Sequence, residues 1–246
     1  MMTQKTGFSF YQRAKRAGNT IAVTAALSLC MSNATAGPLD ITNIDGSWIN
    51  PVPSANVTAL SNTASPGTDS IRWGGTAGDI NSGSGYDFTA ASNITPVALG
   101  TAFVLGTFTH LNLPITQTIS AVEYAFSFDT NGSPANLASI FSFDHNETPN
   151  STGSSPADDD VVTVTSATLN HLITVGTDTY YFNLLGFSVD GGMSFGNIFS
   201  SPENGSNSVR LYGIVTNQPV GAVPTPGTLL LIMCGLLGFT FRRKRS

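Results

Sequence analysis

An uncharged apolar run close to the C-terminus most constrains how this chain can fold. Residues 228–241 contain no charged residue, and the basic residues Arg242, Arg243, Lys244 and Arg245 follow directly. An apolar run that ends in clustered Arg and Lys is typical of a membrane segment whose basic end stays in the cytoplasm. A helix over this run reaches about 21 Å, against a hydrocarbon core of about 30 Å. The sequence therefore predicts a short transmembrane helix at 228–241 and a basic cytoplasmic tail at 242–246.

The N-terminus has the pattern of a secretory signal peptide. A basic stretch with Lys5, Arg13, Lys15 and Arg16 precedes a short apolar run from Thr20 to Met31. Ala34-Thr35-Ala36 then offers a small-x-small cleavage site. An apolar run this short before such a site indicates a cleaved leader rather than a spanning helix. We therefore expect residues 1–36 to be removed during export.

Cysteine and charge divide the chain into the same three parts. Both cysteines, Cys30 and Cys234, lie in the terminal segments, so the exported domain predicted at 37–217 must fold without a disulfide. This domain holds two basic and all fifteen acidic residues, a formal charge of −13. So few cations argue against binding DNA, RNA or an anionic polysaccharide through Lys and Arg contacts. Residues 218–227, rich in Pro and Gly, predict a linker.

The domain itself has the pattern of β-structure. From Gln117 to Phe128, apolar and polar residues alternate with aromatic side chains on one face, which predicts a half-buried antiparallel strand. Phe126–Asp129 recurs as Phe141–Asp144, which predicts two similar strands that each end in a turn begun by Asp. Further strands are predicted at Ser70–Trp73, Thr101–Leu111, Val161–Thr165, Thr179–Val189 and Val209–Val215. Eight to ten strands at this spacing predict an all-β fold, an antiparallel β-sandwich of jelly-roll-like topology.

The segment Thr109-His110-Leu111-Asn112 is the first candidate site. On a strand, His110 and Asn112 share a face with Phe108, while Thr109 points the other way. An imidazole and an amide so placed could hold a sugar hydroxyl. The alternative is a structural pair whose hydrogen bonds are satisfied within the fold, which is the usual state of buried polar groups and the interpretation that we favour.

An acidic stretch is the second candidate site. Its oxygen-bearing side chains suit Ca²⁺, which takes six to eight oxygen ligands. A solvated acidic turn is the alternative, and it is favoured because most charge runs are solvated. The residues are Asp144, Asn146, Glu147, Asp158, Asp159 and Asp160.

The C-terminal segment resembles the PEP-CTERM sorting tail. Val223, Pro224, Thr225 and Pro226 precede the Leu-rich apolar run and the terminal Arg cluster, in the order of such tails. The chain differs at Thr225, where the motif that names the family has Glu. The resemblance implies export in an exopolysaccharide-producing Gram-negative bacterium and processing by an exosortase, a membrane-embedded enzyme. The apolar run would then be a transient anchor; the alternative is an ordinary single-pass tail anchor.

The first candidate site is similar to the signature of the THxN family of PEP-CTERM proteins. Thr109, His110 and Asn112 match its signature positions, and Ile71-x-Trp73-Gly74 and Ser84–Phe88 are similar to the surrounding sequence there. The family resemblance brings no assigned catalytic activity with it.

These observations together predict a non-enzymatic protein at the cell surface or in the exopolysaccharide matrix, with a structural or adhesive role. Its partners would be an exosortase, the inner membrane and the matrix, and not nucleic acid. The alternative is a calcium-assisted carbohydrate-binding module that uses an aromatic strip of Trp48, Trp73 and Tyr86. A hydrolase is the third hypothesis, although no catalytic motif supports it. No cofactor is required by any motif, and Ca²⁺ is the one that the acidic stretch would suit.

Overall fold

The computed structural model describes residues 38–60, 67–76, 78–79, 81–134, 139–148, 156–166 and 170–220. The predicted signal peptide, sorting motif, apolar run and basic tail all lie outside these residues, as does most of the predicted linker. Within the described ranges, no helix has the length and apolar character needed to cross a membrane.

The described residues form thirteen β-strands and no helix. The first seven strands are β1 (Ile41–Val52), β2 (Val57–Leu60), β3 (Thr68–Trp73), β4 (Ser84–Ala90), β5 (Ala102–Asn112), β6 (Ala121–Thr130) and β7 (Ser133–Pro134). The other six are β8 (Ser139–Asn146), β9 (Asp160–Ser166), β10 (His171–Val175), β11 (Asp178–Ser188), β12 (Ile198–Ser201) and β13 (Gly205–Thr216). The prediction of an all-β fold is confirmed.

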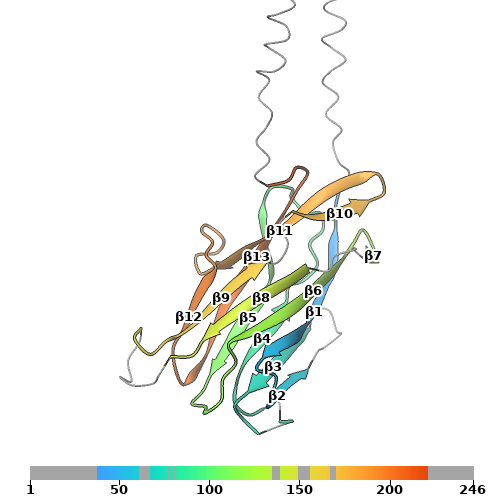
Figure 1. Ribbon diagram of the computed structural model, residues 1–246. Coiled ribbons are helices and arrows are strands. Elements are labelled where there is room, and N and C mark those ends of the chain that lie inside the picture. Colours follow the sequence, from blue (N-terminus) through green and yellow to red (C-terminus); the bar gives the residue numbers. More distant parts are fainter. Residues whose placement is uncertain are drawn as a thin grey trace, which may run out of the picture. The chain divides into compact units, whose positions relative to one another are not determined.

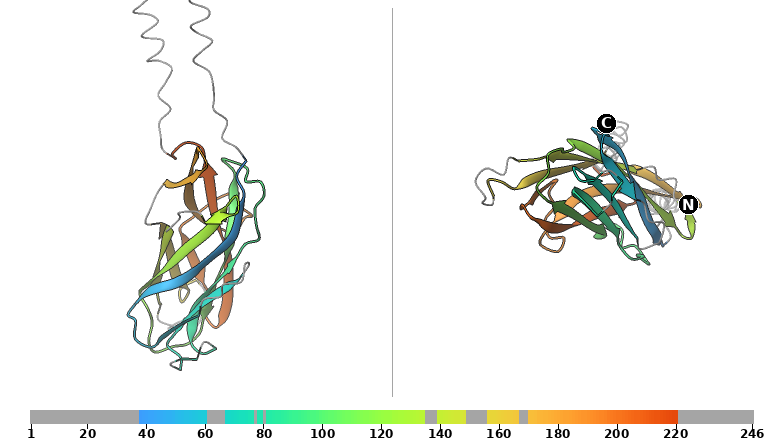
Figure 2. Two further views of the ribbon diagram at one scale, coloured as in Figure 1. Left: turned by 90° about the vertical axis from the view of Figure 1, so that its right-hand side faces the viewer. Right: turned by 90° about the horizontal axis from the view of Figure 1, so that it is seen from below.

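The strands build two antiparallel sheets (Figure 1). One sheet has the order β1-β6-β8-β9-β12, with the short β7 beside β6, and the other has the order β10-β11-β13-β5-β4-β3-β2. Aromatic side chains from both sheets fill the space between them. Phe108 of β5 stacks on Phe143 of β8 with ring centroids 5.2 Å apart. Turned views show the two layers (Figure 2).

Strand β6 has the predicted inward and outward faces. Val122, Tyr124, Phe126 and Phe128 are buried, whereas Ser127 between them is exposed. The strand begins at Ala121 and not at Gln117. The reason lies in the neighbouring strand: the pairing of β1 with β6 ends at Val52 and Ala121, and Ser120 already bonds back to the Val52 carbonyl.

The two repeated Phe-Ser-Phe-Asp segments are strands, but neither Asp begins a turn. Asp129 lies inside β6, paired with Thr42, and Asp144 lies inside β8, paired with Ala121 and Thr163. The turn after β6 falls on Asn131 and Gly132, which both have a positive φ. Asn and Gly tolerate that left-handed conformation, so the turn forms two residues later than predicted.

The predicted aromatic strip is wrong, because its three rings are core residues. Trp48, Trp73 and Tyr86 are only 5%, 2% and 0% exposed. Trp48 lies between the sheets, 4.8 Å from the ring of Tyr124 and 5.3 Å from that of Phe143. A ring that stacks on a sugar must present a face to solvent, so these residues cannot form a carbohydrate platform.

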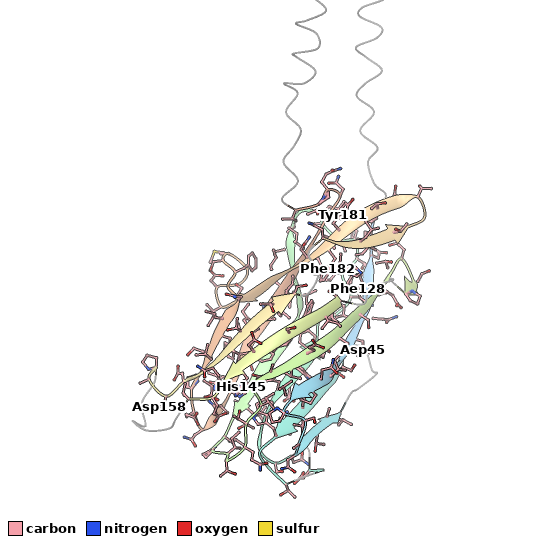
Figure 3. All side chains as sticks on the ribbon, in the orientation of Figure 1. Asp45, Phe128, His145, Asp158, Tyr181 and Phe182 are labelled. Carbon is pink, nitrogen blue, oxygen red and sulfur yellow. The ribbon has the colours of Figure 1, made fainter. Side chains whose placement is uncertain are left out.

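Both ends of the described sandwich lie at the same end of its sheets. The connection between β4 and β5 joins them: Val97 donates to the Leu39 carbonyl at 2.7 Å, and Gly100 donates to the Val215 carbonyl at 2.8 Å. His145 and Asp158 lie at the opposite end, away from Tyr181 (Figure 3). The molecule thus has an entry end and a far end.

Asp190 organises the turn after β11. It accepts hydrogen bonds from the hydroxyls of Ser188 and Ser194 and from the backbone N–H groups of Met193 and Ser194. The hydroxyl of Ser194 contributes most, and together these donors hold the pKa of the Asp190 carboxyl well below its usual range. The carboxylate form is therefore the one that the folded turn prefers.

We expect Asp190→Asn to lower the melting temperature at neutral pH. Because the folded-state pKa is depressed, the stabilisation is present above the unfolded pKa of about 3.9 and is lost as pH falls below it. The gap between wild type and variant should therefore be constant from pH 7 to about pH 5 and narrow below about pH 4. Thermal denaturation across this range measures the gap, and Ser194→Ala should reproduce part of it. A gap that does not change with pH would contradict the assignment.

Candidate functional site

The signature segment lies at the far end of β5, and its residues point in opposite directions as predicted. His110 and Asn112 are both 0% exposed and face the other sheet. Thr109 faces outward, where its hydroxyl bonds that of Ser208 on β13 at 2.8 Å. The alternation of the strand therefore places the histidine and the asparagine in the interior and leaves Thr109 a cross-strand pair.

His145 reaches the same interior from the facing sheet. It lies near the end of β8, in phase with the buried Phe141 and Phe143, and is itself 6% exposed. Asp144 and Asn146 alternate with these residues and are exposed on the other face. These two members of the predicted acidic site therefore point away from the interior.

The acidic triplet is buried, so the interpretation as a solvated turn is wrong for these three residues, although solvation holds for the exposed Asp144 and Asn146. Asp158, Asp159 and Asp160 are 3%, 7% and 0% exposed. Asp159 accepts a hydrogen bond from the Ser200 hydroxyl at 2.8 Å. Asp160, the first residue of β9, accepts one from the Thr148 backbone N–H at 2.9 Å. Asp159 and Asp160 are therefore hydrogen-bonded to different residues within the fold.

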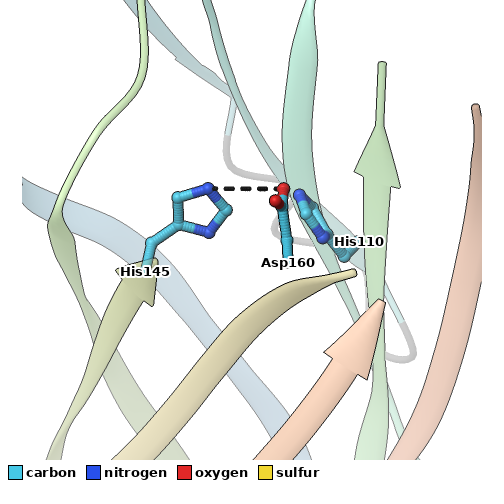
Figure 4. Close-up of side chains that lie close together, drawn as sticks. All are labelled: His110, His145 and Asp160. Carbon is cyan, nitrogen blue, oxygen red and sulfur yellow. Dashed lines mark ion pairs between the residues drawn. The ribbon is translucent and has the colours of Figure 1, made fainter. Parts of the chain in front are cut away.

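Five side chains meet between the sheets at the far end, and we call them the polar cluster: His110, His145, Glu147, Asp160 and Glu203. Ligand atoms of His110, His145 and Asp160 all lie within 4.8 Å of one another, and so do those of Glu147, Asp160 and Glu203. Asp160 belongs to both groups and lies between the two histidines (Figure 4).

His145 makes the polar contacts of the cluster. Its Nε2 atom lies 3.2 Å from Oε2 of Glu147 and 3.8 Å from Oδ2 of Asp160. On the other side of the ring, Nδ1 lies 2.6 Å from the Tyr86 hydroxyl. Tyr86 is directly opposite His110 in the pairing of β4 with β5. The ring of His145 is therefore fixed from both of its nitrogens.

Buried atoms of the cluster have no hydrogen-bond partner within the described part of the chain. These atoms are both ring nitrogens of His110 and Oδ2 of Asp160. Asn112 is half satisfied, because its Nδ2 donates to the Ser201 carbonyl at 2.9 Å while its Oδ1 has no partner. The favoured interpretation of His110 and Asn112 as a satisfied structural pair is therefore wrong. A buried polar atom without a partner costs about 1–3 kcal/mol, which is seldom tolerated without a function.

Aromatic rings wall the two histidines. Trp73 stacks near His110 with centroids 6.1 Å apart and meets His145 edge-on at 5.3 Å. Tyr86 lies 5.1 Å from His110 and 5.7 Å from His145. These rings remove water from the imidazoles and leave little room for them to turn.

Burial shifts the protonation of the cluster. It lowers the pKa of His110 to about 3, with a further contribution from His145 nearby, so this ring is neutral at physiological pH. It raises the pKa of Asp160 to about 6, against the hydrogen bond from Thr148, and the charges of Glu147 and Glu203 add to the increase. A neutral imidazole with a free lone pair is the form of histidine that binds metals.

The structure thus rearranges the predicted candidates. Asp160 of the predicted acidic site meets His110 of the signature segment, and Glu147 lies beside Asp160, while Asp144, Asn146 and Asp159 do not join them. Sequence reasoning missed His145 and Glu203 as members. A signal for His145 was present, since it continues the inward phase of Phe141 and Phe143. For Glu203 there was none, because it lies in the connection before β13.

Two hollows open on the described surface, one of them beside Trp73, whose ring packs against both histidines. One is lined by Pro53, Ala55, Trp73, Gly74, Gln117 and Thr118. The other is lined by residues of β1, β6 and β8, among them Asp45, Ser47, Ser127 and Ser139. No member of the cluster lines either hollow.

No protein-family model matches this chain, and no curated protein matches it. The likeness to the PEP-CTERM tail and to the THxN signature therefore depends on the residues quoted for it, and function has to be argued from the sequence and the site.

Proposed function

We propose that this chain is an exported structural or adhesive protein of the cell surface or the exopolysaccharide matrix. The leader at 1–36, the tail beginning at Val223 and the cysteine-free acidic domain between them support export. An exosortase would act on the tail, and the inner membrane would hold the chain until then. The jelly-roll-like topology is the finer part of this proposal, supported by the repeated passage of the chain from one sheet to the other.

The observation that carries the proposal is the position of the first and last strands of the described domain. Leu39 and Val215 are tied to the same β4–β5 connection, so the domain is entered and left at one end. A domain held through residues beyond Val220 would therefore present its far end away from the attachment. This is the arrangement that a displayed surface module needs.

The burial of the polar cluster supports a role without catalysis. His110 and Asp160 are 0% exposed, and no member of the cluster lines either of the described hollows. A catalytic group must reach its substrate, and ligand sites are normally open clefts. The carbohydrate-binding alternative loses its aromatic strip to the core, so a binding face for it would have to be sought on other residues.

Intact mass of the protein recovered from the surface of an exosortase-bearing host tests the proposal. We expect a polypeptide that begins at Gly37 and ends within residues 223–227. The double substitution Pro224→Ala, Pro226→Ala should leave the full tail attached and the protein in the inner membrane. Pro219→Ala, in the same linker but outside the motif, is the matched control and should be processed normally.

A second variant addresses the departure from the family motif. Thr225→Glu restores the residue that the motif carries, and we expect it to raise the processed fraction. Recovery of the full-length chain from the cytosol, with residues 1–36 and 242–246 still present, would refute the proposal.

A further inference from the structure

The carboxylates of the polar cluster indicate a positively charged ligand. Three carboxylates, those of Glu147, Asp160 and Glu203, converge within 4.8 Å. Among the described residues, Glu147 and Asp160 form ion pairs with His145, at 3.2 Å and 3.8 Å, and Arg72 is engaged with Asp87 at 2.8 Å. Carboxylates this close repel one another, the more so because Asp160 is fully buried, unless a proton or a metal ion compensates them.

The histidines distinguish between a shared proton and a metal ion. A proton shared among the carboxylates would explain Asp160, but it would give His110 no partner. His110 is fully buried, and neither of its ring nitrogens has a hydrogen bond. One of these nitrogens lies within 4.8 Å of a carboxylate oxygen of Asp160 and of a ring nitrogen of His145. A metal ion among these atoms would satisfy the imidazole and the carboxylate together.

We propose that His110, His145 and Asp160 bind one divalent transition-metal ion of the zinc class between the two sheets, with Glu147, 3.2 Å from Nε2 of His145, as the neighbouring carboxylate. Two imidazole nitrogens exclude the all-oxygen shell that Ca²⁺ and Mg²⁺ prefer, and they suit zinc and its neighbours. A zinc-class ion thus takes the place of Ca²⁺ as the ion expected at this end of the domain.

Two distances from His145 can be compared with the spacing of ligand atoms in a tetrahedral site. Zinc lies about 2.0–2.1 Å from nitrogen and oxygen ligands, which places tetrahedral ligand atoms about 3.3 Å apart. Nε2 of His145 lies 3.2 Å from Oε2 of Glu147 and 3.8 Å from Oδ2 of Asp160, on either side of that value. The ligand atoms of His110, His145 and Asp160 lie within 4.8 Å of one another, so side-chain movement would have to bring them closer to bind one ion.

Tyr86 is the positioning residue of the site. With Nε2 of His145 on the metal, the proton of this imidazole resides on Nδ1, which donates to the Tyr86 oxygen 2.6 Å away. A second partner of this kind fixes the tautomer and the ring of a ligating histidine. Because His110 comes from one sheet and His145 and Asp160 from the other, the ion ties the sheets together at the far end, as a disulfide would in a chain that has cysteine there.

Titration of the full chain, tag-free, in detergent and stripped with EDTA, tests the proposal with Zn²⁺, Co²⁺ and Ca²⁺ as probes. We expect one equivalent of Zn²⁺ to bind and one equivalent of Co²⁺ to produce the visible absorption of a tetrahedral site. Free Zn²⁺ at a hundredfold above Kd should raise the melting temperature by about 5–10 °C, because only the folded state holds the site. Ca²⁺ should produce neither effect.

Asp160→Asn separates binding from folding. Asn keeps an oxygen acceptor for the Thr148 N–H and removes one buried charge, so the metal-free variant should melt at or above the wild-type temperature. Its Zn²⁺ affinity should nevertheless fall at least about a hundredfold, and His110→Ala should lose binding equally. Asp159→Asn, in the same segment, and His171→Ala, on β10, are the matched controls and should bind as wild type does.

Three results would overturn the proposal. These are no saturable Zn²⁺ binding by the stripped protein, unchanged affinity in Asp160→Asn and His110→Ala, and a Ca²⁺ response that Asp159→Asn abolishes. The last would restore the all-oxygen site. None of these results depends on where the protein is sorted, so the test stands apart from that of the proposed function.

Discussion

Phe108→Ala is expected to lower the free energy of unfolding by about 3–5 kcal/mol, because it opens a cavity at the centre of the core. The ring is 0% exposed and stacks on Phe143 with the planes 8° apart. Its ring centroid also lies 4.8 Å from that of Tyr86, 5.5 Å from that of Phe187 and 5.9 Å from that of Phe199. Aromatic pairs at these distances add to the area that each ring buries. Rings so interlocked cannot collapse into the space that Phe108 leaves.

Equilibrium denaturation in urea measures this loss, with Leu172→Ala as the control. Leu172 lies on β10 and is 53% exposed, so its truncation should change stability by no more than about 0.5 kcal/mol. Similar losses in the two variants would contradict the placement of the core between β5 and β8.

Gly85→Ala is the second substitution with a large expected effect. Its one added carbon atom is expected to lower the free energy of unfolding by about 3 kcal/mol or more. A Cβ at Gly85 would lie 2.1 Å from the Ile71 carbonyl oxygen and 2.5 Å from Cδ of Arg72. Gly85 is paired with Arg72 on β3 and with Leu111 on β5, so backbone surrounds it on both sides. Overpacking of a side chain costs about 1–3 kcal/mol, and a backbone oxygen yields less readily than a side chain.

Gly196→Ala is the matched control for this prediction. No atom lies within 4 Å of a Cβ built at Gly196, and its backbone is not in the left-handed region. Its hydrogen bonds to Phe187 come from the backbone and should survive. Denaturation midpoints of both variants, with soluble yield as a second readout, check the expectation. A Gly85→Ala protein as stable as Gly196→Ala would show that β3 and β4 are not paired in this register.

Strand β6, whose alternation is unbroken, could be predicted from the sequence, whereas β1, which is interrupted twice, could not. The inward face of β6 follows directly from Val122 to Phe128. Strand β1 escaped prediction although it is one of the longest, because its register shifts between Thr42 and Asp45 and again between Ile49 and Val52. Asn43 and Asn50 have positive φ values there, of 51° and 50°. Each irregularity changes which residues face inward and so erases the period of two.

The candidate site was predictable in pieces and not as a whole. Both His110 and Asp160 were candidates, but for different sites, because one belongs to a strand pattern and the other to an acidic run. Their meeting depends on β5 and β9 lying in opposite sheets, which local sequence does not encode. Proximity along the chain was misleading in turn, since Asp144 is next to His145 but points to the other face.

The place of the last strand bears on how the domain would respond to a mechanical load. Strand β13 lies between β11 and β5, and not at the margin of its sheet. A pull on the polypeptide after Thr216, directed along the strand, would strain the ladders on both of its sides at once, in shear. Hydrogen bonds between strands that are loaded in shear must break together, whereas those of an edge strand can break one after another. A tether attached after Thr216 would therefore load two rows of hydrogen bonds at once, those to β11 and those to β5.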